Sequence, residues 1–210
     1  DAYWQYDGDP SPDKPHAELS GGGCSNGFID MPSILCYPYI AEILGRELGR
    51  VLKLHHGIVT DFVISSPYSA ITFGHEVAKE LGAVFRHPVK DPSDPKQKRM
   101  LWRGKPMPAG SRVLRIEELI TTTSTILEVT KAVHDAHKGI KIRLLGYVGT
   151  AVHRPDSLPV VYPYLFVVSL FEKVMQNFPP DKRCPYCEVG SKKLRPRQSP
   201  ENWAKLMGTA

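Results

Sequence analysis

The protein has 210 residues, of which 41% are hydrophobic and 23% are charged, a composition typical of a globular domain with a sizeable core. Its formal net charge of +5 suits an anionic ligand but does not by itself establish one. The sequence has no apolar run of about 18 residues, which argues against a membrane span. Its first residues also lack the basic and then apolar pattern of a secretory signal.

The cysteines and the basic residues argue against two further classes of protein. Cys24, Cys36, Cys184 and Cys187 are too few for a disulfide scaffold in a chain of this length, so we expect a reducing, cytoplasmic location. The densest basic stretch, "SKKLRPR" at 191–197, has no interleaved aromatic residues. We therefore expect no nucleic-acid partner.

Helical and extended patterns alternate along the chain. Residues 1–18 are rich in proline, aspartate and aromatic residues and are predicted to form an irregular arm, followed by a glycine-rich turn at 21–30. Helices are predicted at 31–55, 70–81 and 124–137, and strands at 61–66, 83–85, 112–116, 141–152 and 164–170. This order predicts an α/β fold with a doubly wound, mainly parallel sheet that has helices on both faces.

Ligands of such folds bind beyond the carboxyl ends of the strands. Residues 65–70, 117–125 and 151–155 each follow a predicted strand, so we expect them to form the site. The segment 87–110 carries six lysines or arginines and has little apolar periodicity. A loop of this length inside a domain is usually functional or disordered.

The stretch "VLRIEELITTTSTILEV" at 113–129 places two carboxylates and a run of hydroxyls between a strand and a helix. Backbone N–H groups and the helix N-terminus bind phosphate in such loops, and the hydroxyls add further donors. Glu117 and Glu118 would repel a phosphate, but they can accept hydrogen bonds from a sugar diol or hold Mg²⁺. The alternative is a helix that Thr or Ser caps, with a polar loop before it.

This stretch resembles the phosphoribosyl-pyrophosphate (PRPP) motif of type I phosphoribosyltransferases. Three further segments resemble parts of orotate phosphoribosyltransferases: "LSGGGCSNGFID" the N-terminal substrate segment, "DFVISSPYSAITFGHEVAKELGA" the pyrophosphate loop and its helix, and "GTAVHRPD" the strand end with an orotate-binding arginine. "NFPPDKRCPYCEVGSKKLRP" resembles the cysteine-bearing tail of one bacterial and archaeal branch. The resemblance covers roughly residues 18–197 in the family's order.

The resemblance implies a type I phosphoribosyltransferase fold with a small N-terminal hood and a C-terminal tail. The expected division is an arm at 1–18, the main domain with its hood at 19–177, and the tail at 178–210. The implied reaction transfers a 5-phosphoribosyl group from PRPP to orotate, with Mg²⁺ bound to PRPP, in a homodimer. Alternatives are a phosphoribosyltransferase for another base, or a protein that binds a nucleotide or phosphorylated sugar without turnover.

The resemblance also assigns individual roles. Glu117 and Glu118 would bind the ribose hydroxyls and, weakly, the magnesium of PRPP. The remaining binding roles fall to Thr121, Thr122, Thr123, Ser124 and Thr125 for the 5′-phosphate, Ser69 and Ala70 for pyrophosphate, Arg154 for the orotate carboxylate and Phe28 for the base. Lys98 and Arg103 are the first candidates for contacting pyrophosphate in catalysis, with Lys96 and Arg99 as rivals.

Four segments depart from the family's pattern. In the PRPP motif, Glu118 stands for the second acid, usually Asp, and Thr123 and Ser124 replace two glycines. In the pyrophosphate loop, Ser69 and Ala70 replace Gly-Gly. Gly23 replaces a basic residue of the N-terminal segment, and His153 replaces the Asp before the arginine. Two of these changes add a β-carbon where glycine permits a positive φ and close approach of a phosphate. The substituted glycines favour the non-catalytic alternative, and Arg154 favours a carboxylated pyrimidine.

Cys184 and Cys187 form a CxxC motif, which is half of a zinc site. Two further ligands are needed, and Cys24 and Cys36 are distant in sequence, although a dimer mate could contribute. We therefore favour two unbridged thiols over zinc. Zinc measured near one per chain after dialysis would reverse this interpretation.

Overall fold

The computed structural model describes residues 2–158 and 162–209, which group into two compact units. The sheet unit contains residues 31–154 and 162–173, and the terminal unit contains 2–30, 155–158 and 174–209. This grouping differs from the expected division at 18 and 177. The arm, the segment after it and the tail belong to one unit because their short strands pair with one another.

The sheet unit is built on five parallel strands in the order β11-β10-β9-β5-β6. The strands are β5 (Phe62–Ser65), β6 (Val84–Arg86), β9 (Arg112–Ile120), β10 (Arg143–His153) and β11 (Phe166–Glu172). Central β5 is mostly apolar because helices cover both faces of the sheet. β9 is buried over most of its length although it carries Arg112, Arg115, Glu117 and Glu118. The predicted doubly wound α/β fold is confirmed.

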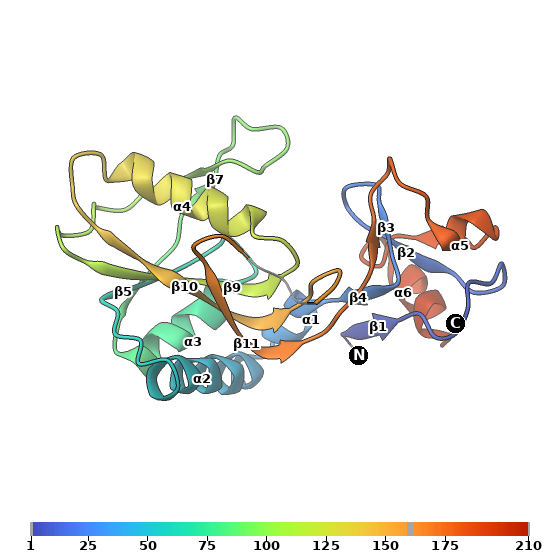
Figure 1. The fold of residues 1–210 in the computed structure, drawn as a ribbon, viewed down its shortest axis with the longest axis horizontal. Helices are drawn as coiled ribbons and strands as arrows, with labels where there is room; N and C mark the ends of the chain where they lie inside the picture. Colours follow the sequence, from blue (N-terminus) through green and yellow to red (C-terminus); the bar gives the residue numbers. More distant parts are fainter. Residues whose placement is uncertain (1, 159–161, 210) are drawn as a thin grey trace. The chain divides into compact units, whose positions relative to one another are not determined.

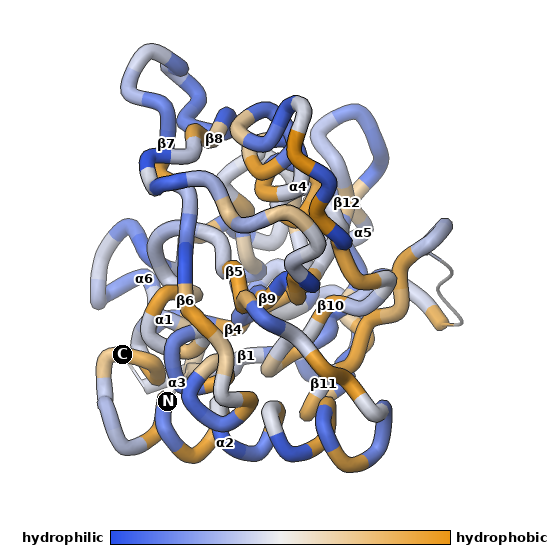
Figure 2. The backbone as a smooth tube through the Cα atoms, turned by 90° about the vertical axis from the view of Figure 1, so that its left-hand side faces the viewer, coloured by the Kyte–Doolittle hydropathy of each residue, from blue (hydrophilic) through white to orange (hydrophobic). Residues whose placement is uncertain are grey.

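Helices α2 (Pro38–Leu54) and α3 (Ile71–Leu81) cover one face of the sheet, and α4 (Ser124–Ala136) covers the other (Figure 1). Figure 2 shows hydrophobic and hydrophilic stretches alternating along α2, as expected of a helix that buries one side. Its buried side includes Leu48 and Leu52. No helix in the described ranges is long and apolar enough to cross a membrane.

The helix predicted at 31–55 is two helices, α1 (Met31–Leu35) and α2. Pro38 causes the break, because proline has no N–H to donate and is tolerated only in the first turn of a helix. The residue before it, Tyr37, is extended, with φ −89° and ψ 111°. The helical spacing of apolar residues that predicted this helix begins at Ile40, so it supports α2 and does not extend to the residues before Pro38.

Two further elements differ from the prediction. Strand β9 does not end at Ile116 but continues to Ile120, because β10 pairs with it as far as the Ile120–His153 position. The segment 87–110 is not wholly a loop. It contains an antiparallel hairpin of β7 (Val89–Lys90) and β8 (Met100–Leu101).

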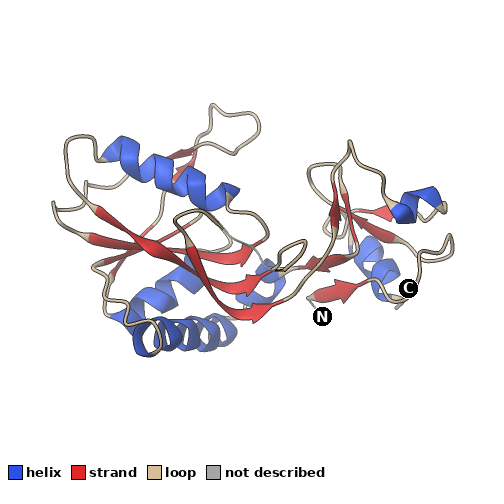
Figure 3. Ribbon diagram, viewed as in Figure 1, coloured by secondary structure: helices blue, strands red, loops and turns tan. Residues whose placement is uncertain are grey.

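The terminal unit consists of short strands and two helices (Figure 3). Strand β1 (Tyr3–Gln5) pairs with β4 (Gly27–Ile29). A second sheet has the order β12 (Asn177–Phe178), β3 (Cys24–Ser25), β2 (His16–Glu18) and β13 (Lys193–Leu194). Helices α5 (Pro185–Glu188) and α6 (Pro200–Met207) belong to the same unit, so the predicted arm and tail are more regular than expected.

Candidate functional site

The carboxyl ends of four parallel strands meet at one edge of the sheet. In the observed register, Ser65 of β5 pairs with Ile116 of β9, and Glu117 lies beside Thr150 of β10. His153, at the end of β10, lies beside Glu172 of β11. The three segments predicted to form the site therefore follow neighbouring strands in the sheet unit.

Two buried glutamates occupy the middle of this edge. Glu117 is 5% exposed and Glu118 9% exposed, and both belong to β9 rather than to the loop after it. One oxygen of each is held by a serine of the β5–α3 loop: Ser66 Oγ donates to Glu117 Oε1, and Ser69 Oγ donates to Glu118 Oε1. The second oxygen of each carboxylate is buried without a hydrogen-bond partner among the described residues. Buried acceptors in this state indicate a ligand with hydroxyl or metal groups to offer.

The pair has a distinctive electrostatic state. Burial raises the pKa of Glu117 well above its usual value of 4.5, and the neighbouring Glu118 carboxylate raises it further. The hydrogen bond from Ser66 and the positive charge of Lys90 lower the pKa of Glu117, but by less. Glu117 is thus costly to ionise, and a cation or hydroxyl donors at its open oxygen would favour the ionised form.

The hydroxyl-rich stretch opens α4. Residues 121–123 form a short turn, Ser124 is the first residue of the helix, and the hydroxyls of Thr122 and Ser124 lie 3.0 Å apart. Thr123 stands at the N-cap position without a side-chain cap, so the alternative of a helix capped by this hydroxyl is wrong. The first N–H groups of α4 remain available to an anion.

The residues that replace the glycines do not need a positive φ. Thr123 has φ −86° and ψ 7°, and Ala70, at the start of α3, has φ −83° and ψ 0°. Among the described non-glycine residues, only Gln97 and Tyr164 have a positive φ. At these substituted positions φ therefore lies in the range that residues with a β-carbon accept readily.

Arg154 and His153 end β10. Arg154 is buried, and its backbone N–H donates to Ile120 O at 2.7 Å, which fixes it beside the end of β9. The ring of His153 is held on both sides, with Nδ1 2.9 Å from Glu172 Oε2 and Nε2 3.0 Å from the Tyr162 hydroxyl. The histidine that replaces the family's aspartate is thus a fixed part of the strand end.

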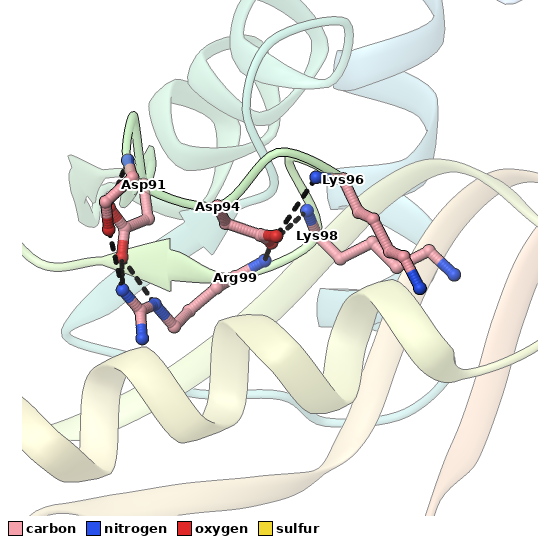
Figure 4. Close-up of polar contacts among 6 residues, drawn as sticks. Asp91, Asp94, Lys96, Lys98 and Arg99 are labelled. Atoms are coloured by element: carbon pink, nitrogen blue, oxygen red, sulfur yellow. Dashed lines mark hydrogen bonds and ion pairs between the residues drawn. The ribbon is translucent and has the colours of Figure 1, made fainter.

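The basic segment is organised by two aspartates (Figure 4). The Asp94 carboxylate accepts hydrogen bonds from the backbone N–H groups of Lys96, Lys98 and Arg99 at 3.0, 2.8 and 2.7 Å. The guanidinium of Arg99 is paired with Asp91. Figure 4 shows the lysine side chains extending away from Asp94.

Of the four cationic candidates, Arg99 is therefore occupied within its own loop. Among the described residues, none forms a hydrogen bond or ion pair with the side-chain nitrogens of Lys96, Lys98 or Arg103. These three side chains are free to meet a ligand, and Asp94 holds the backbone at Lys96 and Lys98 in place.

Phe28 belongs to the terminal unit. It lies on β4, its ring centroid is 6.0 Å from that of Trp203, and the Arg197 guanidinium lies 5.8 Å from the ring. Gly23, which replaces a basic residue of the family, has a packing explanation, because a β-carbon there would lie 2.7 Å from Phe178 O. A lysine or arginine does not fit without a shift of the backbone.

Two residues near the glutamates were missed as site residues. Ser66 was recognised only as part of a loop, and its contact with Glu117 joins side chains 51 positions apart. Lys90 stood in the basic segment, but nothing in the sequence showed that its charge would act on the Glu117 carboxylate. Such effects between residues far apart in the chain are not visible in the local sequence.

A parallel five-stranded sheet with an acidic pair at the end of a central strand and a hydroxyl-rich turn after it is the arrangement of type I phosphoribosyltransferases. Orotate phosphoribosyltransferase from Aeropyrum pernix superposes with a TM-score of 0.56 at 16% identity, over 76% of this chain and 86% of that one. The Mycobacterium tuberculosis enzyme, solved with Fe(III) dicitrate, gives 0.54 at 18% identity, over 84% and 90%. These likenesses establish the fold.

The sequence relatives define the family. No family model matches the sequence. The orotate phosphoribosyltransferase of Caldanaerobacter subterraneus subsp. tengcongensis is 30% identical over 184 residues, covering 87% of this chain and 88% of the relative. That of Thermoanaerobacter sp. is 29% identical over the same length, with the same coverage. The chain belongs to the orotate phosphoribosyltransferase family.

Proposed function

We propose that the protein transfers the 5-phosphoribosyl group of PRPP to orotate, giving orotidine 5′-monophosphate and pyrophosphate. The observation that carries the proposal is the buried pair Glu117 and Glu118, each with one oxygen held by a serine and the other without a partner among the described residues. Two such acceptors fit two adjacent hydroxyls, and a ribose presents a vicinal diol.

The next segment of the chain suits the phosphate of the same ligand. The turn at 121–123 begins directly after β9, and the α4 N-terminus that follows offers N–H groups and exposed hydroxyls. The open oxygens of Glu117 and Glu118 also fit Mg²⁺, which prefers carboxylate oxygens and keeps most of its waters. When bound, the ion would neutralise charge on the pyrophosphate group.

In the reaction, the bond between the ribose C1 carbon and the pyrophosphate oxygen breaks, and a ring nitrogen of the base forms the new bond. Negative charge grows on the departing pyrophosphate. Lys98 and Arg103 supply free cations for it, and the hydrogen bonds to Asp94 hold the backbone at Lys98. Positioned charges of this kind stabilise a transition state by about 3–4 kcal/mol each.

Arg154 is proposed to select the base. A guanidinium binds a planar carboxylate through two parallel hydrogen bonds, which suits orotate better than an uncharged purine. Its burial would make that pair stronger than an exposed one. Phe28 is kept as the proposed contact to the base, and the homodimer and the cytoplasmic location are parts of the same proposal.

The non-catalytic alternative rested on the lost glycines. The ordinary dihedrals at Thr123 and Ala70 remove the backbone part of that argument, since no glycine is required at either place. The added β-carbons still occupy volume, and binding measurements decide whether the ligand fits beside them.

Calorimetry with PRPP and Mg²⁺, followed by an assay for orotidine monophosphate, tests the proposal. We expect binding and turnover in the wild type, and in Arg154→Lys an orotate KM raised by at least tenfold with PRPP affinity unchanged. Glu42→Gln, a charge change on the exposed face of α2, serves as the matched control. Binding without product would select the non-catalytic alternative, and absence of PRPP binding would refute the proposal.

A further inference from the structure

Four side chains with metal-binding atoms converge in the terminal unit. His16 lies on β2 and Cys24 on β3. Cys184 is the N-cap residue of the short helix α5, and Cys187 lies within that helix. One ligand atom of each lies within 4.8 Å of all the others. His16 and Cys24 come from the first segment of the chain and Cys184 and Cys187 from the last, so that Cys24 and Cys187 are 163 positions apart.

Three of the six separations between the ligand atoms are close to the edges of a tetrahedral zinc site. With Zn–S bonds of about 2.3 Å and a Zn–N bond of about 2.0–2.1 Å, the S–S edge is about 3.8 Å and the S–N edge about 3.5 Å. Cys24 Sγ lies 3.6 Å from Cys187 Sγ. His16 Nε2 lies 3.4 Å from Cys187 Sγ and 3.7 Å from Cys184 Sγ.

The tautomer of His16 is fixed in the form that binds metal. Ser191 Oγ lies 2.6 Å from the Lys14 carbonyl oxygen, which can only accept, so the single hydroxyl proton is donated there. Ser191 Oγ must then accept from His16 Nδ1–H at 2.8 Å. Nε2 is left with its lone pair directed at the thiols, and a hydrogen bond to the other ring nitrogen is the usual support of a histidine ligand.

We propose that these four side chains bind one structural zinc ion. Three thiolates and one imidazole are a soft donor set that selects zinc over magnesium or calcium, and four protein ligands leave no open position for catalysis. Binding releases the thiol protons to solvent, so affinity falls as pH falls. The inference rests on the terminal unit alone and is independent of the proposed reaction.

The arrangement argues against a redox pair of cysteines. All four cysteines of the chain are free, and three of them gather around one histidine instead of forming an isolated pair. Cys24 and Cys184 are buried, whereas redox-active cysteines lie in partly exposed positions.

A bound metal would also stabilise the terminal unit. Its two main segments, 2–30 and 174–209, are separated in sequence by the whole sheet unit, and its strands are two or three residues long. Small units with little core commonly use metals or disulfides for stability. The earlier preference for two unbridged thiols at Cys184 and Cys187 is reversed, because His16 and Cys24 supply the missing ligands.

Metal analysis of the full chain, purified under reducing conditions without added metal and dialysed, tests the proposal. We expect zinc near one per chain in the wild type and in Cys36→Ser, the matched control at the exposed cysteine outside the cluster. Cys187→Ser, at the exposed ligand, is expected to lose at least nine-tenths of the zinc.

A second measurement covers the case in which Cys187→Ser fails to fold. Cobalt exchanged into the wild type is expected to give the thiolate charge-transfer and d–d absorption of a tetrahedral site. Only the Cys36 thiol is expected to react with a thiol reagent until a chelator is added. Reduced wild type with neither zinc nor a cobalt spectrum overturns the proposal, as does a folded Cys187→Ser that keeps full zinc.

Discussion

Replacing Glu117 by glutamine is expected to raise stability and lower affinity for PRPP. Burial and the Glu118 charge raise the pKa of Glu117 in the folded state. At a pH between the usual pKa of 4.5 and this raised pKa, Glu117 keeps its proton in the folded state and has lost it in the unfolded state. The free energy of unfolding therefore falls as pH rises through this range. Glutamine does not titrate, keeps the shape, and retains an oxygen to accept from Ser66.

The loss in binding follows from the hydrogen bond that the carboxylate makes to a ribose hydroxyl. A hydrogen bond to a charged group contributes about 1.5–3 kcal/mol, which corresponds to a rise of about 10- to 150-fold in the Kd for PRPP. The rise in Tm relative to wild type is expected at neutral pH and should disappear below about pH 4.5.

Thermal unfolding from pH 4 to 8 and calorimetry with PRPP and Mg²⁺ measure the two effects, with Glu42→Gln as control. A Glu117→Gln protein with lower Tm at neutral pH would contradict the electrostatic argument. An unchanged Kd would show that this carboxylate does not contact the ligand.

Three more outcomes are expected in the sheet unit. Lys98→Ala should lower kcat about 100-fold while the Kd for PRPP changes less than threefold, which steady-state kinetics and calorimetry can separate. Arg112 lowers the pKa of Asp61 from 3.8 to about 2, so the pair's contribution to stability is present above pH 3.8 and is lost as pH falls toward 2. The difference in Tm between wild type and Asp61→Asn should shrink over that range. Gly45→Ala would place a β-carbon 2.4 Å from Glu76 Cβ, where α2 meets α3, and is expected to lower the free energy of unfolding in urea by about 1–3 kcal/mol. An increase would show that the gain in helix propensity outweighs the clash.

Much of the sheet unit was readable from local patterns. The apolar run at 61–66 corresponds to β5, which buries consecutive residues. The helical spacing before Gly82 corresponds to α3, which buries residues on one side of the helix. Gly82 ends α3 with a φ of +66°, a conformation that glycine adopts without a steric cost. Pro38 is a local signal for the break between α1 and α2, but the apolar period alone does not show it. The continuation of β9 to Ile120 was not readable, because it depends on pairing with β10.

The sequence by itself determined the order of helices and strands, the family resemblance and the candidate acids, because each of these depends on residues close together in the chain. Only the tertiary structure decided which side chains meet. It placed Ser66 and Ser69 on the two glutamates, paired Arg99 with Asp91, and joined His16 and Cys24 to the CxxC of the tail. Those contacts arise from strand pairing and packing between segments that are distant in sequence, so they cannot be read from the residues on either side of each position.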